Sequence, residues 1–233
     1  MNEATPSVTI EPSTALARCR MVRADTEDLV AALSPEDQCV PSMPDARPAK
    51  WHRAPTTCFF EEFVLGPFLK GYQVFDRDFR LVFNSYYDSV DPRHPRPIRG
   101  SLTRPSAEQI GHYRQHVDAA MEKVLAIMPD SASELIELGL QHEQQHQELL
   151  LTDMMHAFSH NPLASPVLPG WHEPVGTGEP TKFVAHDGGS VRIGHADSSF
   201  CFDNEEPVYT VFLRPREIAT RGMPRRVTPA CGC

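Results

Sequence analysis

The stretch Leu138-Gly-Leu-Gln-His142-Glu-Gln-Gln-His146-Gln-Glu-Leu-Leu-Leu-Thr-Asp153 decides the fold of this chain. Its leucines recur at helical spacing, and neither Pro nor Gly interrupts it after Gly139. His142 and His146 are four residues apart, so they lie one above the other on one face of the predicted helix. At about 100° per residue, the same face holds Leu135, Leu149 and Asp153, and the opposite face holds Gln144 and Glu148.

Three other helical patterns precede this one, and together the four predict a helical bundle over residues 13–161. The first runs from Ser13 or Thr14 to about Leu33, and the second is strong from Thr56 onward. Pro55 means that this second helix either begins there or is kinked there. Capping boxes at Ser106–Gln109 and Ser131–Glu134 open the last two helices. The third helix turns an apolar face inward, made of Ile110, Tyr113, Val117, Met121, Val124 and Met128.

The pattern changes after this helical part. Residues 162–181 are rich in Pro and Gly and predict a linker or wrapping loop. Short strands are then expected at 183–185, 188–193 and 207–213, and we expect residues 182–233 to be the start of an incomplete second domain. The predicted fold class is therefore mainly α, with an α+β fragment after the bundle.

Composition excludes some classes of function. The formal net charge is −9 and no basic block appears, which argues against a nucleic-acid partner. We see no signal peptide and no apolar run as long as the roughly 18 residues of a membrane span. The six cysteines are scattered, which does not suggest a disulfide framework. These features predict a cytoplasmic protein without a membrane partner.

The two histidines leave three interpretations open. His142-Glu143-Gln-Gln-His146 matches the H-E-x-x-H pattern of zinc proteases, in which Glu143 would be the general base. The histidines could instead be core residues satisfied by hydrogen bonds. The third interpretation, which the bundle setting favours, is a metal site between facing helices, where imidazole ligands and open coordination positions suit iron or zinc.

Several motifs, in this order along the chain, carry a family resemblance. They are Pro48-Ala-Lys50-Trp51-His52, Phe59-Phe60-Glu61, Phe83-Asn-Ser-Tyr-Tyr87, Arg99-Gly100, Arg104-Pro105-Ser106, His142-Glu-Gln-Gln-His146-Gln-Glu-Leu-Leu and Phe202-Asp-Asn-Glu205-x-Pro207. Together they resemble the ergothioneine-biosynthesis sulfoxide synthases, or hercynine oxygenases, over about residues 15–215. That family has a DinB-like four-helix bundle and then a C-type-lectin-like domain of the formylglycine-generating (sulfatase-modifying) type.

The resemblance implies an activity and a site. The family uses non-haem Fe(2+) and O2 to join the sulfur of cysteine or γ-glutamylcysteine to hercynine as a sulfoxide. It implies that His142 and His146 are two of three iron ligands, and that Arg96 and Arg99 bind the carboxylates of the thiol substrate. Asp153 would orient a ligand from behind, and Asp203–Glu205 would be a structural turn.

The chain departs from the family where the third ligand is expected. Pro55 stands at the position of that histidine, and Pro cannot coordinate through its side chain. His52, one turn earlier, is the nearest imidazole, and Cys58 and Glu61 are other candidates. The second domain is expected to be truncated, with the tyrosine that assists the family's chemistry in the missing part. A catalytically inactive, metal-binding DinB-like bundle is therefore the alternative to an iron-dependent oxygenase.

Overall fold

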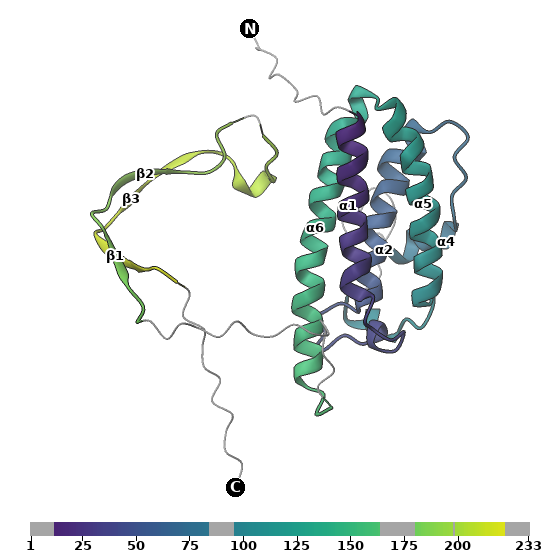
Figure 1. Cartoon of the computed structure of the whole chain (residues 1–233), viewed down its shortest axis with the longest axis horizontal. Helices are drawn as coiled ribbons and strands as arrows, with labels where there is room; N and C mark the ends of the chain where they lie inside the picture. The colour runs from purple at the N-terminus through teal and green to yellow at the C-terminus, as the bar shows by residue number, and fades with distance from the viewer. Residues whose placement is uncertain (1–11, 84–95, 164–179, 198, 222–233) are drawn as a thin grey trace. The chain divides into compact units, whose positions relative to one another are not determined.

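The computed structural model describes residues 12–83, 96–163, 180–197 and 199–221. The chain is mainly helical, with a small antiparallel strand portion near its C-terminus (Figure 1). One compact unit contains the described residues up to 163, and a second contains those from 180 onward. The helical elements are α1 (Pro12–Val30), η1 (Asp37–Cys39), α2 (Ala49–Phe59), η2 (Phe60–Leu65), α3 (Gly66–Phe68), α4 (Arg77–Phe83), η3 (Arg96–Ser101), α5 (Ala107–Ile127) and α6 (Asp130–Ser159).

The helices of the first unit pack against one another in pairs. Helix α6 packs against α1 and α2, and α5 packs against the same two helices (Figure 1). The apolar face predicted for α5 is confirmed for Ile110, Tyr113, Val117, Met121 and Val124, which are all buried. The sixth predicted residue, Met128, is the C-cap of the helix and is only half-buried. Its Ser106 cap is confirmed too: the Ser106 hydroxyl accepts from the Gln109 amide, and the Gln109 side chain accepts from the Ser106 amide.

The structure decides between the alternatives for one helix start and corrects another. Helix α2 begins at Ala49 and passes through Pro55, so of the two alternatives the start at the proline is excluded, and a π-helical segment, η2, follows it directly. Helix α6 begins at Asp130, ahead of the predicted Ser131 cap, with Pro129 as a cap residue that makes no side-chain bond. Pro129 is extended, at ψ 134°, and its fixed φ suits the residue just before a first turn.

The inward face predicted for α6 is only partly right. His146 and Leu150 are buried, but Leu149 is 44% exposed, and Glu143 is fully buried instead. The remaining buried residues of α6 are Ala132, Ile136, Gly139, Leu140 and Met154. The burial stripe is therefore rotated toward Glu143, and His142 lies half-buried at its edge.

The second unit consists of two antiparallel strand pairs. Strand β1 (Phe183–His186) pairs with β4 (Arg216–Ala219), and β2 (Gly189–Ile193) pairs with β3 (Tyr209–Leu213). The predicted turn is present as η4 (Asp203–Glu205), where the Phe202 amide donates to the Glu205 carboxylate at 2.8 Å. Both pairs leave large apolar side chains exposed, including Phe212 at 73%.

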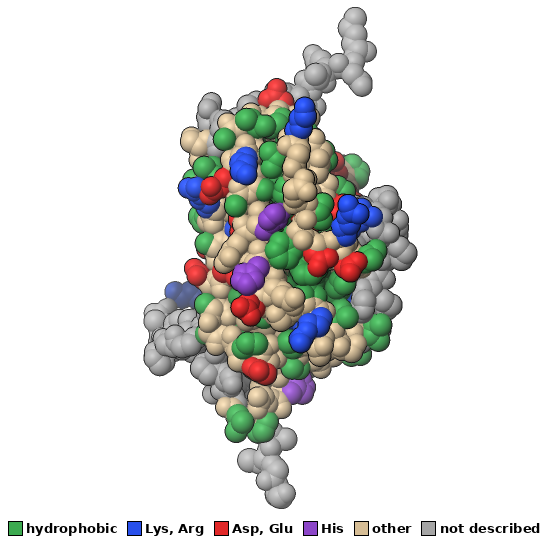
Figure 2. Space-filling model, turned by 90° about the vertical axis from the view of Figure 1, so that its right-hand side faces the viewer, with side chains coloured by type: hydrophobic (Ala, Val, Ile, Leu, Met, Phe, Trp, Pro, Cys, Tyr) green, Lys and Arg blue, Asp and Glu red, His purple; other side chains and the backbone are tan. Residues whose placement is uncertain are grey.

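One face of the molecule is mixed in charge. On the face drawn in Figure 2, Lys and Arg side chains are interspersed with Asp and Glu, and no broad patch of one sign is seen there. Among the described residues, none of the helices combines the length and apolar character needed to cross a bilayer.

Gly139 lets α6 approach the aromatic pair Phe59 and Phe60. A Cβ at Gly139 would lie 2.6 Å from a Phe60 ring carbon and 2.8 Å from a Phe59 ring carbon. We predict that Gly139→Ala lowers the free energy of unfolding by about 1–3 kcal/mol, because the rings cannot both retreat in a packed core. Urea denaturation measures this change.

Gly111→Ala is the matched control, since it makes the same substitution in helix α5. Its Cβ would meet only a guanidinium nitrogen of Arg53, at an ordinary 3.5 Å. We expect Gly111→Ala to stabilise the protein by about 0.5–1 kcal/mol through helix propensity. An equal gain in stability for Gly139→Ala would show that α6 does not approach the rings of Phe59 and Phe60 closely.

Candidate metal centre

Three histidines meet where α2 packs against α6. His142 and His146 come from α6, with ring centroids 4.7 Å apart. His52 comes from α2, and its ring centroid lies 5.2 Å from that of His146. The Nδ1 atoms of His52 and His146 are 3.2 Å apart, and both rings are buried. The structure thus brings together the two predicted ligands and the suggested substitute, His52.

A chain of hydrogen bonds fixes which ring nitrogens carry protons. His52 Nε2 lies 3.1 Å from the Asp153 carboxylate, which also accepts from the backbone amide of Arg47 at 2.8 Å. Burial alone would raise the pKa of Asp153, but these hydrogen bonds outweigh it and hold that pKa below its ordinary value. Asp153 is therefore a carboxylate that can only accept, so His52 donates from Nε2 and presents the Nδ1 lone pair to His146 Nδ1–H.

The three imidazoles are neutral at neutral pH. Burial lowers the pKa of His142 from 6.5 to about 4, and it also lowers those of His52 and His146. The positive charge of Arg47 contributes to the lowering at each of the three. Neutral imidazole is the form that binds a metal, so no proton has to be removed first.

The donor chemistry fits a divalent transition metal. His146 Nε2 is buried and has no hydrogen-bond partner among the described residues, which is unusual for a native core. The described residues contain no group of three or more His, Cys, Asp or Glu already arranged to hold a metal ion. In this structure the facing Nδ1 atoms of His52 and His146 are hydrogen-bonded to each other, so a metal ion bound between them would have to replace that bond.

The other suggested third ligands are occupied or unsuitable. Pro55 is buried within α2 and offers no donor atom. Burial raises the pKa of Cys58 to about 12, so its thiol stays protonated and ligates poorly. The Glu61 carboxylate accepts from the hydroxyls of Tyr72 and Tyr113, at 2.6 and 2.7 Å, and from the Phe75 amide.

Glu143 is held away from any reacting group. Its carboxylate accepts from Arg23 and Arg114, each at 2.8 Å, and from the Thr26 hydroxyl at 2.7 Å. Burial would raise its pKa, but the charges of Arg114 and Arg23 bring it down to about 2. A carboxylate so firmly ionised and fully occupied is a poor general base, which argues against the protease interpretation.

Of the two predicted substrate arginines, the structure describes the side chain of one. Arg99 in η3 is buried and its guanidinium stacks on Trp51, 4.3 Å from the ring centroid. Its charge contributes to the lowered pKa of His146, so it lies near the cluster. The side chain of Arg96 lies outside the described residues.

Sequence reasoning missed the structural role of one residue of this region and missed another residue altogether. Glu143 was considered only as a general base, although Ile136, Leu140, Glu143 and Leu150 follow helical spacing and place its carboxylate within the apolar stripe. Arg47 gave no signal, since its importance rests on a backbone amide in the loop before α2 and on the position of its charge.

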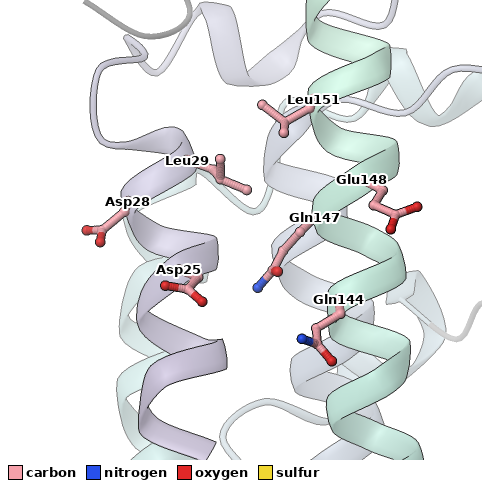
Figure 3. A pocket seen from close by; sticks show the side chains of 7 residues that line it. All are labelled: Asp25, Asp28, Leu29, Gln144, Gln147, Glu148 and Leu151. Atoms are coloured by element: carbon pink, nitrogen blue, oxygen red, sulfur yellow. The ribbon is translucent and has the colours of Figure 1, made fainter. Parts of the chain in front are cut away.

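A groove lies between α1 and α6 (Figure 3), and none of the histidines of the cluster is among its lining residues. Its cavity volume is about 480 Å³. Gln144 and Glu148 line it, which confirms that they face away from the histidines. The other lining residues are Asp25, Asp28, Leu29, Gln147 and Leu151.

Comparison with known proteins adds no assignment: no family model matches this chain, and no curated protein matches it.

We predict that Glu143→Gln destabilises the fold by about 3–5 kcal/mol, because it leaves two buried arginines without their shared anion. Urea denaturation measures the loss. Glu148→Gln, on the exposed side of the same helix, should change stability by less than about 0.5 kcal/mol. If both variants are equally stable, the structural role of Glu143 is refuted.

We also predict that metal-free protein loses stability as the pH falls from 6.5 toward 4.5. In this window the unfolded chain takes up protons at histidines whose folded pKa values lie lower, such as His142 at about 4. The stability that ionised Glu143 contributes is retained in this window. The pKa of its carboxyl is 4.5 in the unfolded chain, so this contribution is lost only as the pH falls below 4.5. Urea denaturation at a series of pH values, with a chelator present, checks this.

His142→Gln should flatten this pH dependence, because it removes one of the titrating imidazoles. His112→Gln, at an exposed position of α5, should leave it unchanged. Stability that is level between pH 6.5 and 4.5 in the unaltered protein would contradict the neutral, buried state of the cluster.

Proposed function

We propose that the chain is a member of the ergothioneine-biosynthesis sulfoxide synthase family, whose helical unit is a DinB-like four-helix bundle that binds Fe(2+) through His142 and His146. The proposed reaction joins the sulfur of cysteine or γ-glutamylcysteine to hercynine with O2, and the bound iron would supply the oxygen activation. In this proposal the strand unit is the beginning of a C-type-lectin-like domain.

One observation carries the proposal. Two neutral imidazoles, half-buried His142 and buried His146, lie one helical turn apart on α6, and His146 meets a third imidazole, the buried His52 of α2. A His146 nitrogen there has no partner among the described residues. Purely structural core histidines normally have their nitrogens satisfied by hydrogen bonds. Imidazole donors with room for further ligands suit Fe(2+), as they do in other non-haem iron sites.

The residues around the cluster support a small anionic substrate. Arg47 and Arg99 are both buried, and both place positive charge near His146. A carboxylate of the thiol substrate would be attracted to this charge, with Arg96 and Arg99 as its proposed binding residues. Burial of the same residues limits water near the reacting groups, which strengthens each of these charge interactions.

The alternative function is a metal-binding bundle without catalysis. It is favoured by Pro55, which places no donor where the family has its third iron ligand. Under this alternative the protein binds divalent metal and forms no sulfoxide.

Anaerobic Fe(2+) titration and a turnover assay separate the two functions. We expect about one iron per chain, and a sulfoxide product, detected by mass spectrometry, when hercynine, a thiol and O2 are added. The double variant His142→Ala/His146→Ala should lose both. Iron binding without product supports the inactive bundle, and iron binding no tighter than that of the double variant refutes the metal centre.

A further inference from the structure

The position of Pro55 raises the question of where a third protein donor comes from. Two imidazoles from a single helix turn leave a metal ion largely exposed to exchange, and bundle sites normally recruit side chains from facing helices. Helix α2 is the element that faces His142 and His146. Of the four α2 and η2 residues considered above, only His52 has a donor nitrogen directed at the α6 histidines.

We infer that His52, oriented by Asp153, is the third protein ligand of a divalent metal ion bound together with His142 and His146. This inference rests on the proposed metal centre but not on the proposed reaction. It assigns metal binding to a side chain one turn before the position where the family resemblance places the third ligand.

The distance between the facing nitrogens supports this assignment. His52 Nδ1 and His146 Nδ1 are 3.2 Å apart. Two nitrogens bound side by side to one ion, each at about 2.1 Å, are separated by roughly 3 Å. The ion can therefore take the place of the shared hydrogen between these two nitrogens, and the His146 proton would move from Nδ1 to Nε2, which has no hydrogen-bond partner among the described residues.

Asp153 sets the ring of His52 in the form that a ligand needs. The carboxylate accepts from His52 Nε2, which leaves the Nδ1 lone pair toward α6. Metal-bound histidines commonly donate their other nitrogen to such a carboxylate. The Arg47 amide holds the same carboxylate oxygen, so its position is fixed by backbone. Asp153 is thus a positioning residue, and its negative charge also offsets the nearby charge of Arg47.

Helix α2 can present His52 despite the proline. The helix begins at Ala49, so His52 lies in its first turn, before Pro55. The His52 amide donates to the Pro48 carbonyl at 3.4 Å, and this bond does not depend on the backbone N–H that Pro55 lacks. The ring of Trp51, stacked under Arg99, anchors the neighbouring residue.

Anaerobic titration of the full chain with Co²⁺, followed by visible absorption, tests the inference without turnover. We expect one Co²⁺ per chain. His52→Ala should weaken its binding at least tenfold, as His142→Ala does, and Asp153→Asn should weaken it about tenfold to a hundredfold. His112→Ala, at an exposed position of α5, should have no effect. Unchanged binding by His52→Ala overturns the inference.

A measurement on the unaltered protein covers the case in which the His52 variant fails to fold. Each ligand histidine keeps one ring N–H, so Co²⁺-loaded protein should show three strongly shifted exchangeable imidazole protons in its NMR spectrum. Two such signals would overturn the inference.

The outcomes also separate this inference from the proposed function. If His142→Ala and His146→Ala abolish binding and His52→Ala does not, only the inference fails. If all three abolish binding but no sulfoxide forms, the inference stands and the proposed reaction fails.

Discussion

The buried carboxylate of Glu143 is the interaction on which the helical unit depends. It joins α6 to Arg23 of α1 and to Arg114 of α5, at 2.8 Å each. A buried charge is tolerated only when it is paired and hydrogen-bonded, so a rotation of α6 that broke these contacts would leave charges buried without a partner. Because Glu143 stands between His142 and His146 in sequence, the contact that rotates α6 also directs the two imidazoles toward α2.

The histidine cluster depends on that alignment in a second way. Burial keeps its imidazoles neutral, and the nearby positive charge of Arg47 acts in the same direction. Asp153 is the anionic group that hydrogen-bonds to the cluster, and it does so from behind His52. The result is a set of lone pairs held in place by one carboxylate and one backbone amide. These contacts keep His52 facing α6, as the function we propose requires.

The sequence predicted the regular parts of this structure well. Helical periodicity located the face of α5, the Ser106 box located its first residue, and the short apolar runs located β1, β2 and β3, but β4 was not predicted. The sequence-based prediction failed where a single tertiary contact determines which residue is buried. Leu149 and Glu143 compete for the inner side of α6, and hydropathy favours the leucine, whereas two buried arginines favour the glutamate. The pairing of His52 with His146 needs the packing of α2 on α6, which sequence spacing does not encode.

The ion pairs around Glu143 form a longer alternating series. Arg53 pairs with Glu27, Glu27 with Arg114, Arg114 with Glu143, Glu143 with Arg23, and Arg23 with Asp118. A change at one inner member leaves a neighbour with uncompensated charge, so the effects of substitutions here are not independent. During evolution, a substitution at one member of the series should therefore be accompanied by a matching substitution at its partner, or apolar residues should replace the whole series. Its members would then appear among related sequences as a co-varying group rather than as separate positions.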